Sequence, residues 1–226
     1  MKSGFLLIKK PSGPTSHDII DELRRITGER KIGHAGTLDP FASGLLIVAV
    51  GREATRNIAQ FIKQDKTYIA KLHLGATSNT FDRTGIIQNG QRPLDILHKV
   101  EIEKILKKFV GEQKQIPPMY SAKKVGGKKL YELARKGVEI ERKPAEIKIH
   151  YIKLLNYKYP ELEIETRVSS GTYIRTLAND IGQALGCGAY LEELQRTEIG
   201  GYKLKNAVET KNLTKENWNN FIVDIK

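Results

Sequence analysis

The stretch from Gly33 to Pro40 restricts the backbone of this chain more than any other part of the sequence. It reads Gly-His-Ala-Gly-Thr-Leu-Asp-Pro. Gly33 and Gly36 permit positive φ and the close approach of another group, while Pro40 disfavours a helical conformation at the preceding residue. The stretch therefore predicts a tight loop between two regular elements, and this loop presents the carboxylate of Asp39 in a fixed direction.

A second demanding stretch runs from Gly171 to Leu177. It reads Gly-Thr-Tyr-Ile-Arg-Thr-Leu and opens a predicted helix, so that Arg175 lies in the first turn. An opposite charge within a few ångströms stabilises an ionised carboxylate and lowers its pKa by about 1 to 3 units. We therefore predict Arg175 as the counter-ion of Asp39. The alternative is that the two residues form an ordinary surface ion pair, which would contribute little to stability.

Length and cysteine content limit the class of protein. A chain of 226 residues can build one large domain, or one domain with an insertion. The longest apolar runs, Phe5 to Ile8 and Leu45 to Val50, are too short to cross a bilayer, and the N-terminus lacks a signal-peptide pattern. Cys187 is the only cysteine, which is typical of a reducing compartment. We therefore expect a cytoplasmic protein with no membrane partner.

The formal net charge of +12 indicates polyanionic partners, because a basic surface that neutralises phosphates releases their counterions. Much of this charge is gathered between Pro117 and Lys143, a segment that we predict to be an inserted arm. Tyr120 and Tyr131 lie there among basic residues, as in proteins that bind single-stranded or loop RNA. A solvated loop and helix is the alternative. The candidate basic contacts are Lys123, Lys128, Lys129 and Arg135.

The hydrophobic pattern predicts a mixed α/β chain of the α+β class. Strands occur in groups with helices between them and do not alternate regularly, which favours a largely antiparallel central sheet flanked by helices. Predicted strands are Phe5 to Lys10, Leu45 to Val50, Tyr68 to Leu74, and a hairpin of Ile147 to Leu155 with Leu162 to Val168. Predicted helices are one capped by Ser16 and ended by Gly28, one around Ile102 to Phe109, and one from Ile174 to Leu185.

Taken in order, the motifs of this chain resemble those of the TruB-type tRNA pseudouridine synthases. The resemblance extends from the N-terminus to about Val208, which makes the series far more specific than any single motif. The matching stretches are Lys9-Lys10-Pro11 with Thr15-Ser16, Gly33 to Gly44, Asp65 to Tyr68, Ser78 to Gly85, Pro118 to Lys123, Leu130 to Glu132, Gly171 to Thr176, and Leu191 to Arg196.

The resemblance implies a pseudouridine synthase fold and the isomerisation of uridine 55 in the T-loop of tRNA, without a metal or another cofactor. The N-glycosidic bond must break, the uracil must turn, and C5 of the base must join C1′ of the sugar. Asp39 could attack C1′, add to the base, or remove a sugar proton, and the sequence leaves these three routes open.

Roles for further residues follow from the same resemblance. Asp82 joins Arg175 on the side away from Asp39, Tyr68 stacks on the target base, and Leu194, near the end of a helix, closes the other side of the base pocket. An ordinary surface ion pair is the alternative for Asp82 with Arg175, and a core tyrosine and a core leucine are the alternatives for Tyr68 and Leu194.

The resemblance also implies base flipping. His34 would fill the space of the extruded nucleotide, the alternative being a histidine bonded to local backbone. Lys66 and the basic and aromatic residues of the arm would contact RNA.

The chain departs from the family pattern at its C-terminal end. Family members usually continue into a small RNA-binding domain of the PUA type, whereas this sequence stops at Lys226, and Gln195 stands where an arginine is common. We expect a catalytic domain over residues 1–208, including the arm at about 117–143, and a short helical tail over 209–226. A monomer that recognises the T stem-loop, with no obligate protein partner, is the expected form.

Two other function classes remain open at this stage. An RNA-binding or RNA-folding protein could extrude a base without needing Asp39 for chemistry. An RNA N-glycosidase would use a carboxylate at C1′ but would admit water and release the base.

Overall fold

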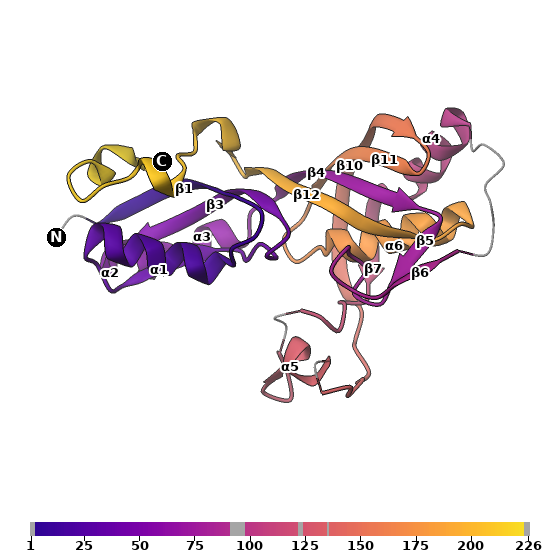
Figure 1. Cartoon of the computed structure of the whole chain (residues 1–226), viewed down its shortest axis with the longest axis horizontal. Coiled ribbons are helices and arrows are strands. Elements are labelled where there is room, and N and C mark those ends of the chain that lie inside the picture. Colours follow the sequence, from indigo (N-terminus) through magenta and orange to yellow (C-terminus); the bar gives the residue numbers. More distant parts are fainter. Residues whose placement is uncertain (1–2, 91–97, 122–123, 135, 224–226) are drawn as a thin grey trace. The chain divides into compact units, whose positions relative to one another are not determined.

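The computed structural model describes residues 3–90, 98–121, 124–134 and 136–223. The chain forms two compact units. Unit 1 consists of Met1–Ile69 and Leu194–Lys226, and unit 2 consists of Ala70–Glu193. Two long strands, β4 (Lys66–Leu74) and β12 (Ala189–Ile199), each pass from one unit to the other. The mixed α+β class with mostly antiparallel strands is confirmed (Figure 1).

Unit 1 is built on antiparallel pairs of very apolar strands. β1 (Gly4–Lys10) pairs with β3 (Ser43–Val50), and β2 (Ile32–Ala35) also pairs with β3, with Ala35 opposite Ile47. The later part of β12 lies parallel to β3, and a short strand, β13 (Tyr202–Lys203), turns back on it. The predicted strands at Phe5 to Lys10 and Leu45 to Val50 are therefore confirmed.

The strands of unit 1 are buried on both faces, which explains their nearly continuous apolar runs. On one face, Leu6 and Val48 pack with Ile19 and Leu23 of α1 (Ser16–Thr27). On the other face, apolar side chains of β1 and β3 pack with residues of α2 (Arg52–Asn57) and α3 (Ala59–Ile62). Alternate residues of each strand point to opposite faces, so both cores draw on the same two strands.

The N-terminal cap of α1 differs from the predicted one. Thr15 is the cap, because its backbone is extended and its Oγ1 accepts the Asp18 N–H at 3.0 Å, while the Asp18 carboxylate accepts the Thr15 N–H at 2.7 Å. Ser16, which we predicted as the cap, is the first helical residue, and its hydroxyl contacts Leu38 instead. Gly28 ends the helix in the left-handed conformation, as predicted.

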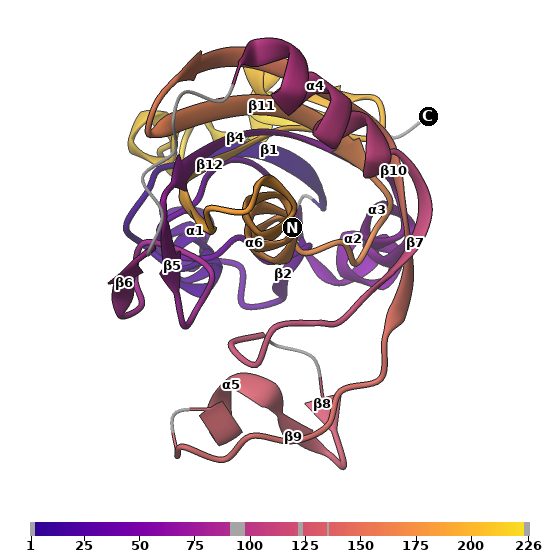
Figure 2. The same ribbon diagram turned by 90° about the vertical axis from the view of Figure 1, so that its right-hand side faces the viewer.

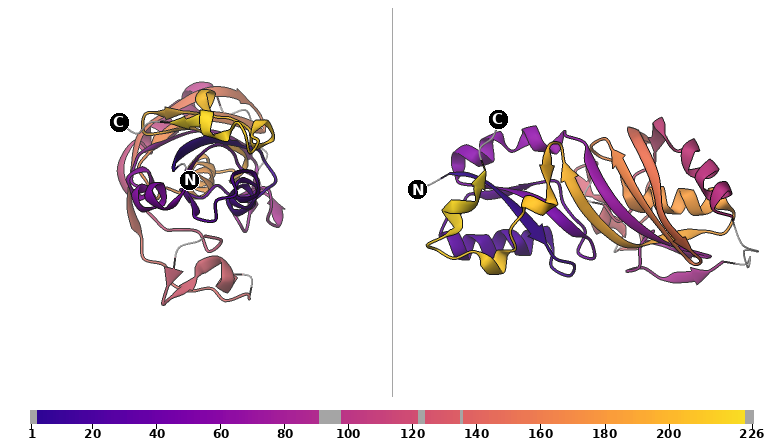
Figure 3. Two further views of the ribbon diagram at one scale, coloured as in Figure 1. Left: turned by 90° about the vertical axis from the view of Figure 1, so that its left-hand side faces the viewer. Right: turned by 90° about the horizontal axis from the view of Figure 1, so that it is seen from above.

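The C-terminal segment is part of unit 1 and packs against its first strand and helix. It forms the 3₁₀ turns η1 (Leu204–Asn206), η2 (Thr210–Asn212) and η3 (Trp218–Phe221), followed by β14 (Ile222–Val223), which pairs with β1. Figure 3 shows this gold segment beside the indigo strand β1. Trp218 and Leu213 join the core against α1, so the segment completes a hydrophobic core.

Unit 2 contains the predicted hairpin. β10 (Ala145–Lys158) and β11 (Glu161–Val168) are antiparallel, and β7 (Gly111–Gln115) pairs with the other side of β10. The helices α4 (Lys99–Lys108) and α6 (Ile174–Leu185) pack beside these strands (Figure 2). A separate short hairpin consists of β5 (Ala76–Ser78) and β6 (Ile87–Asn89).

The predicted arm is an insertion between β7 and β10. Its described part contains the two-residue strands β8 (Lys124–Val125) and β9 (Lys128–Lys129) and the helix α5 (Leu130–Ala134). Figures 1 and 2 show the arm projecting away from the sheet of unit 2. No helix within the described ranges is long and apolar enough to cross a membrane.

Candidate active site

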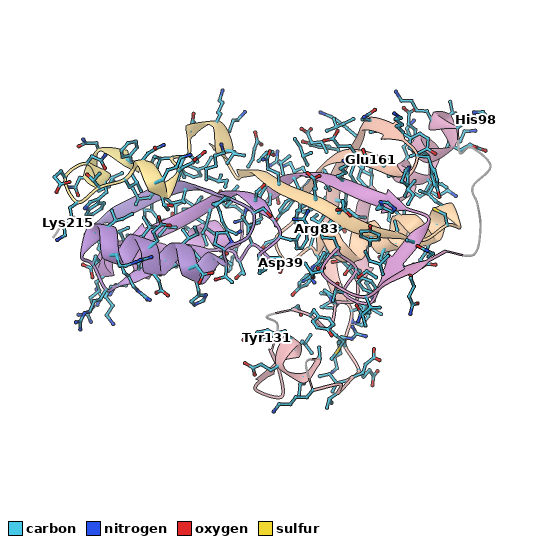
Figure 4. All side chains as sticks on the ribbon, viewed as in Figure 1. Asp39, Arg83, His98, Tyr131, Glu161 and Lys215 are labelled. Atoms are coloured by element: carbon cyan, nitrogen blue, oxygen red, sulfur yellow. The ribbon has the colours of Figure 1, made fainter. Side chains whose placement is uncertain are left out.

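Asp39 lies in unit 1, in the loop between β2 and β3 that the sequence predicts (Figure 4). We name residues Gly36 to Ala42 the Asp39 loop. The Ser16 hydroxyl accepts the Leu38 N–H at 3.0 Å and donates to the Leu38 carbonyl at 3.1 Å, and the Ala42 N–H donates to the Asp39 carbonyl at 3.0 Å. The Asp39 side chain is half-buried. The backbone on both sides of the carboxylate is thus held by neighbouring groups.

Lys10 holds the second half of the Asp39 loop. Its residue is 0% exposed, and its Nζ donates to the carbonyls of Ala42 at 2.7 Å, Pro11 at 2.8 Å and Pro40 at 3.4 Å. Burial lowers the pKa of Lys10 to about 8, and the opposite charge of Asp39 counters part of that effect. Lys10 belongs to a motif of the family resemblance, but the sequence alone did not single it out as a site residue.

Arg196 holds the beginning of the same loop. Its Nε donates to the Leu45 carbonyl at 2.8 Å and its Nη2 to the Gly36 carbonyl at 3.0 Å. Gly36 has positive φ, as predicted, whereas Gly33 lies in the extended strand β2. Sequence reasoning missed Arg196, because nothing in the sequence shows that a residue of β12 reaches the loop after β2.

Lys66 is also buried in unit 1. Its Nζ donates to the carbonyls of Ile62 and Gln64, both at 2.6 Å. Burial lowers the pKa of Lys66 to about 8, and the positive charge of Arg196 acts in the same direction. The ammonium is therefore engaged by main-chain carbonyls, and its contact with RNA stays a prediction.

His34 lies on β2 and is half-buried. Its ring meets that of His17 edge to face, with 5.8 Å between centroids, and within the described part of the chain its Nδ1 has no hydrogen-bond partner. Burial lowers the pKa of His34 to about 4, and the charges of His17 and Arg196 contribute to the same shift. The imidazole is therefore neutral at pH 7.

This shift predicts a pH dependence of stability. The folded chain holds His34 neutral down to about pH 4, whereas the unfolded chain protonates this histidine near pH 6.5. Stability contributed by His34 is therefore present above pH 6.5 and is lost as the pH falls toward 4. In denaturant titrations, the free energy of unfolding should fall more steeply over this window for the wild type than for His34→Gln. If the free energy of unfolding depends on pH in the same way for both proteins, the lowered pKa of His34 is contradicted.

Tyr68 and Leu194 both belong to unit 1, and each is 8% exposed. Tyr68 lies on β4, as predicted. Leu194 lies on the strand β12, so its predicted place near the end of a helix is wrong. Leucine and glutamate favour a helix in isolation, but pairing of β12 with neighbouring strands imposes the extended conformation.

Arg175 and Asp82 form a buried ion pair in unit 2. Nη1 of Arg175 lies 3.1 Å from Oδ2 of Asp82, and the two side chains are 6% and 3% exposed. Nη1 also donates to the Thr80 carbonyl at 3.3 Å, and Nη2 donates to the Tyr120 carbonyl at 2.7 Å. The contact is therefore not an ordinary surface ion pair, and it fixes the guanidinium at the start of α6.

Asp82 is itself held by its own turn. Its Oδ1 accepts the Thr80 hydroxyl at 2.8 Å, the Thr84 N–H at 2.9 Å and the Thr84 hydroxyl at 2.5 Å. Both carboxylate oxygens therefore have donors. Asp39 belongs to unit 1 and Arg175 to unit 2, and the pairing of these two residues stays a prediction.

The arm residues predicted to bind RNA are only partly described. Tyr120 and Tyr131 are half-buried, and the Tyr131 N–H donates to the Ser121 carbonyl at 3.0 Å. Lys123 and Arg135 lie outside the described residues, and Lys128 and Lys129 are described only as the backbone of β9. Among the residues that the structure describes, no group of three or more His, Cys, Asp or Glu side chains is placed to hold a metal ion.

Two family models match adjoining parts of the chain. The N-terminal domain of the TruB family of pseudouridylate synthases matches residues 24–174, and the C-terminal domain of tRNA pseudouridylate synthase B matches residues 175–224. The matched ranges include Asp39, Tyr68, Asp82 and Arg175, as well as most of the C-terminal segment of unit 1.

Named relatives match over most of the chain. The tRNA pseudouridine synthase B of Protochlamydia amoebophila is 47% identical over 91% of this chain and 77% of its own length. The protein of the same name from Chlamydia abortus is 44% identical over 92% of this chain and 88% of its own length.

Among solved structures, a chain of a Cbf5-Nop10-Gar1 complex is similar, with a TM-score of 0.71 and 31% identity. It aligns with 91% of this chain, which spans about half (52%) of that longer chain. A chain of an H/ACA RNP bound to a substrate RNA has a TM-score of 0.69 and 28% identity, covering 96% of this chain and 55% of its own length.

Proposed function

Because this chain belongs to the TruB family of pseudouridylate synthases, we propose that it converts uridine 55 in the T-loop of tRNA to pseudouridine. Relatives named tRNA pseudouridine synthase B at 44% to 47% identity support this reaction. The structural observation that carries the proposal is the Asp39 loop, whose carbonyls and amides are held by Lys10, Ser16 and Arg196. A carboxylate on such a loop is ready to react without first being ordered.

Asp39 supplies the reactive carboxylate in this proposal. It cleaves the bond between N1 of uracil and C1′ of the ribose by attack at C1′, by addition to the base, or by removal of a sugar proton. The detached uracil turns within the site, and its C5 forms the new bond to C1′. The hydrogen on C5 then leaves as a proton, so substrate and product are isomers.

Arg175 supplies positive charge for the carboxylate in this proposal, and Asp82 sets the direction of Arg175. The support is the buried pair of these two residues, in which the guanidinium is also held by the carbonyls of Thr80 and Tyr120. A guanidinium held in one direction stabilises charge in the reacting carboxylate without reorganisation during the reaction.

The target base leaves its stack before the reaction, at a cost of a few kcal/mol. Tyr68 provides an aromatic face for the extruded uracil, Leu194 closes the other side, and His34 occupies the vacated space. The neutral state of His34 supports a space-filling role, because a neutral ring can enter a stack of bases without the desolvation cost of a cation.

Substitutions at Tyr68 should separate stacking from proton removal. In this proposal the phenolic oxygen of Tyr68 helps to take the proton that leaves C5 of the base. Tyr68→Phe keeps the aromatic face and loses this oxygen, so we expect RNA affinity near that of the wild type with much slower turnover. Tyr68→Leu should also lose the stacking contact, which is worth about 1 to 3 kcal/mol per base. Binding titrations and single-turnover rates on a T-arm RNA measure the two effects. A fully active Tyr68→Phe would reduce the residue to a stacking platform.

The basic arm contacts the phosphates of the T stem in this proposal. Each phosphate contact contributes about 0.7 to 0.9 to the slope of log affinity against log salt. The triple change of Lys123, Lys128 and Lys129 to Gln should therefore flatten that slope.

A matched control removes three lysines elsewhere. Lys153, Lys203 and Lys211 each form an exposed ion pair with a glutamate, so their change to Gln alters the net charge equally and should leave the slope unchanged. Equal slopes for the arm variant and the wild type would favour the solvated-arm interpretation.

Tritium release from a T-arm RNA labelled at C5 of uridine tests the reaction itself, because a bond to C5 expels that hydrogen. We expect release in proportion to pseudouridine formed. Free uracil instead of pseudouridine would identify an N-glycosidase, and RNA binding without either product would identify an RNA-folding protein. In this proposal the protein works in the cytoplasm as a monomer, without an obligate protein partner. Gel filtration coupled to light scattering measures its oligomeric state.

A further inference from the structure

Arg196 has the largest fully buried side chain among the described residues, yet the proposed reaction gives it no direct role. It is 1% exposed, and burying a guanidinium costs free energy unless its donors are satisfied. Two of its nitrogens donate to main-chain carbonyls, those of Leu45 and Gly36. A buried guanidinium that donates to two main-chain carbonyls fixes the positions of those carbonyls relative to each other.

The two acceptors lie on opposite sides of the Asp39 loop. Gly36 follows directly after β2, and Leu45 lies near the beginning of β3. The bonds at 3.0 Å and 2.8 Å therefore join the first residue of the Asp39 loop to the strand that follows the loop. The planar fork of a guanidinium can reach both acceptors at once in a fixed geometry, which the single ammonium of lysine cannot reproduce.

The sequence places Arg196 there by an unusual strand contact. β12 lies parallel to β3, with Arg196 opposite Gly44 and Gln195 opposite Ser43. Gly44 has a φ of 114°, and a Cβ at this position would overlap the backbone of Arg196. Gly44 therefore permits the close approach that brings the guanidinium of Arg196 to the base of the Asp39 loop.

We propose that Arg196 is a positioning residue of the isomerisation: by joining the Gly36 and Leu45 carbonyls, it holds the Asp39 loop in the geometry that the reaction requires. This inference rests on the proposed function, in which the carboxylate of Asp39 reacts. Misplacing a reacting group by about 1 Å can cost a hundredfold in rate. Lys10 and Ser16 hold the rest of the loop, but Arg196 alone among these three links the beginning of the loop to β3.

The electrostatic surroundings agree with this assignment. The charge of Arg196 contributes to the lowered pKa values of Lys10, His34 and Lys66, so the guanidinium lies close enough to act on all three groups around the loop.

Three variants test the inference. Arg196→Met removes both hydrogen bonds, and Arg196→Lys keeps the charge but presents all its donors from one nitrogen, so it cannot reproduce the fixed geometry of two separate nitrogens. Leu213→Ala is the matched control, because it opens a cavity in the core of unit 1 against α1, away from the loop. We expect kcat on a T-arm RNA to fall about a hundredfold for Arg196→Met and less for Arg196→Lys. The Kd for the RNA should stay within about threefold, and Leu213→Ala should lower Tm but not kcat.

A second measurement reads the loop directly. The Ala42 N–H donates to the Asp39 carbonyl and the Leu38 N–H to the Ser16 hydroxyl, so both amides report the closed loop. Their hydrogen exchange should accelerate in both Arg196 variants relative to Leu213→Ala.

The possible results separate this inference from the proposed function. Folded Arg196 variants that keep the wild-type kcat, or that raise KM alone, would overturn the positioning role. Unchanged exchange of the two amides would overturn it as well. If the wild type releases no tritium, the proposed function fails, while amide exchange still decides whether Arg196 holds the loop.

Discussion

Asp39→Asn should reduce pseudouridine formation at least a thousandfold, which corresponds to about 4 kcal/mol in activation free energy. The amide has nearly the shape of the carboxylate but can act neither as a nucleophile nor as a base at neutral pH. The loop contacts made by Lys10, Ser16 and Arg196 involve backbone atoms, so they persist in the variant. The affinity for T-arm RNA should therefore stay close to that of the wild type.

The measurement is single-turnover tritium release with enzyme in excess over RNA, combined with a binding titration. Asp21→Asn is the matched control, because it makes the same change at an exposed carboxylate of unit 1 that pairs with Arg24 on α1. This control should be fully active. Turnover of Asp39→Asn within about tenfold of the wild type, or about 1.4 kcal/mol, would remove Asp39 from the reaction.

Asp82→Ala should lower the free energy of unfolding by about 3 to 5 kcal/mol. The substitution leaves the guanidinium of Arg175 buried without its counter-charge, and it also removes the acceptor of the Thr80 and Thr84 donors. Denaturant titration measures the loss. Glu112→Gln is the control in unit 2, since Glu112 pairs with Lys148 on the surface and should change stability little.

A double variant distinguishes an unpaired charge from a general defect of the turn. Asp82→Ala combined with Arg175→Met removes both charges, so it should be more stable than Asp82→Ala alone. A double variant less stable than both single variants would mean that the turn around Asp82, and not its charge, supports unit 2.

Several elements of the fold could be predicted because their signals are local. The apolar runs of β1 and β3 and the alternating patterns of β10 and β11 indicate strands by their composition and periodicity. Gly28 indicates the end of α1 because a left-handed cap favours glycine. The predicted cap of α1, Ser16, lies one residue after the observed cap, Thr15. Both residue types can cap a helix, so the sequence does not distinguish them.

Leu194 shows where local signals fail. The residues around it favour a helix when they are considered alone, yet they form β12 because strands that are distant in sequence provide hydrogen-bond partners. The same strand carries Arg196 to the Asp39 loop. Because this strand was not predicted, neither the position of Leu194 nor the contact of Arg196 with the Asp39 loop could be predicted.

The sequence by itself determined the chemistry-bearing groups and their local frames. Asp39 lies in a loop because glycine and proline restrict the backbone around it, and Arg175 lies in the first turn of α6 because that helix follows Gly171-Thr172-Tyr173. Such signals act over a few residues, so they can be recognised in the sequence without any knowledge of the fold.

Only the tertiary structure decided which groups hold the Asp39 loop in place. Lys10 and Arg196 reach the Asp39 loop from strands that are 29 and 157 positions away from Asp39 in the numbering. The pair of Asp82 with Arg175, 93 positions apart, was expected through the family resemblance alone, and the structure confirms it. These contacts depend on strand pairing and burial, and a buried cation must find carbonyl or carboxylate partners wherever the fold supplies them. That requirement, which no local pattern records, determines how the candidate site is held.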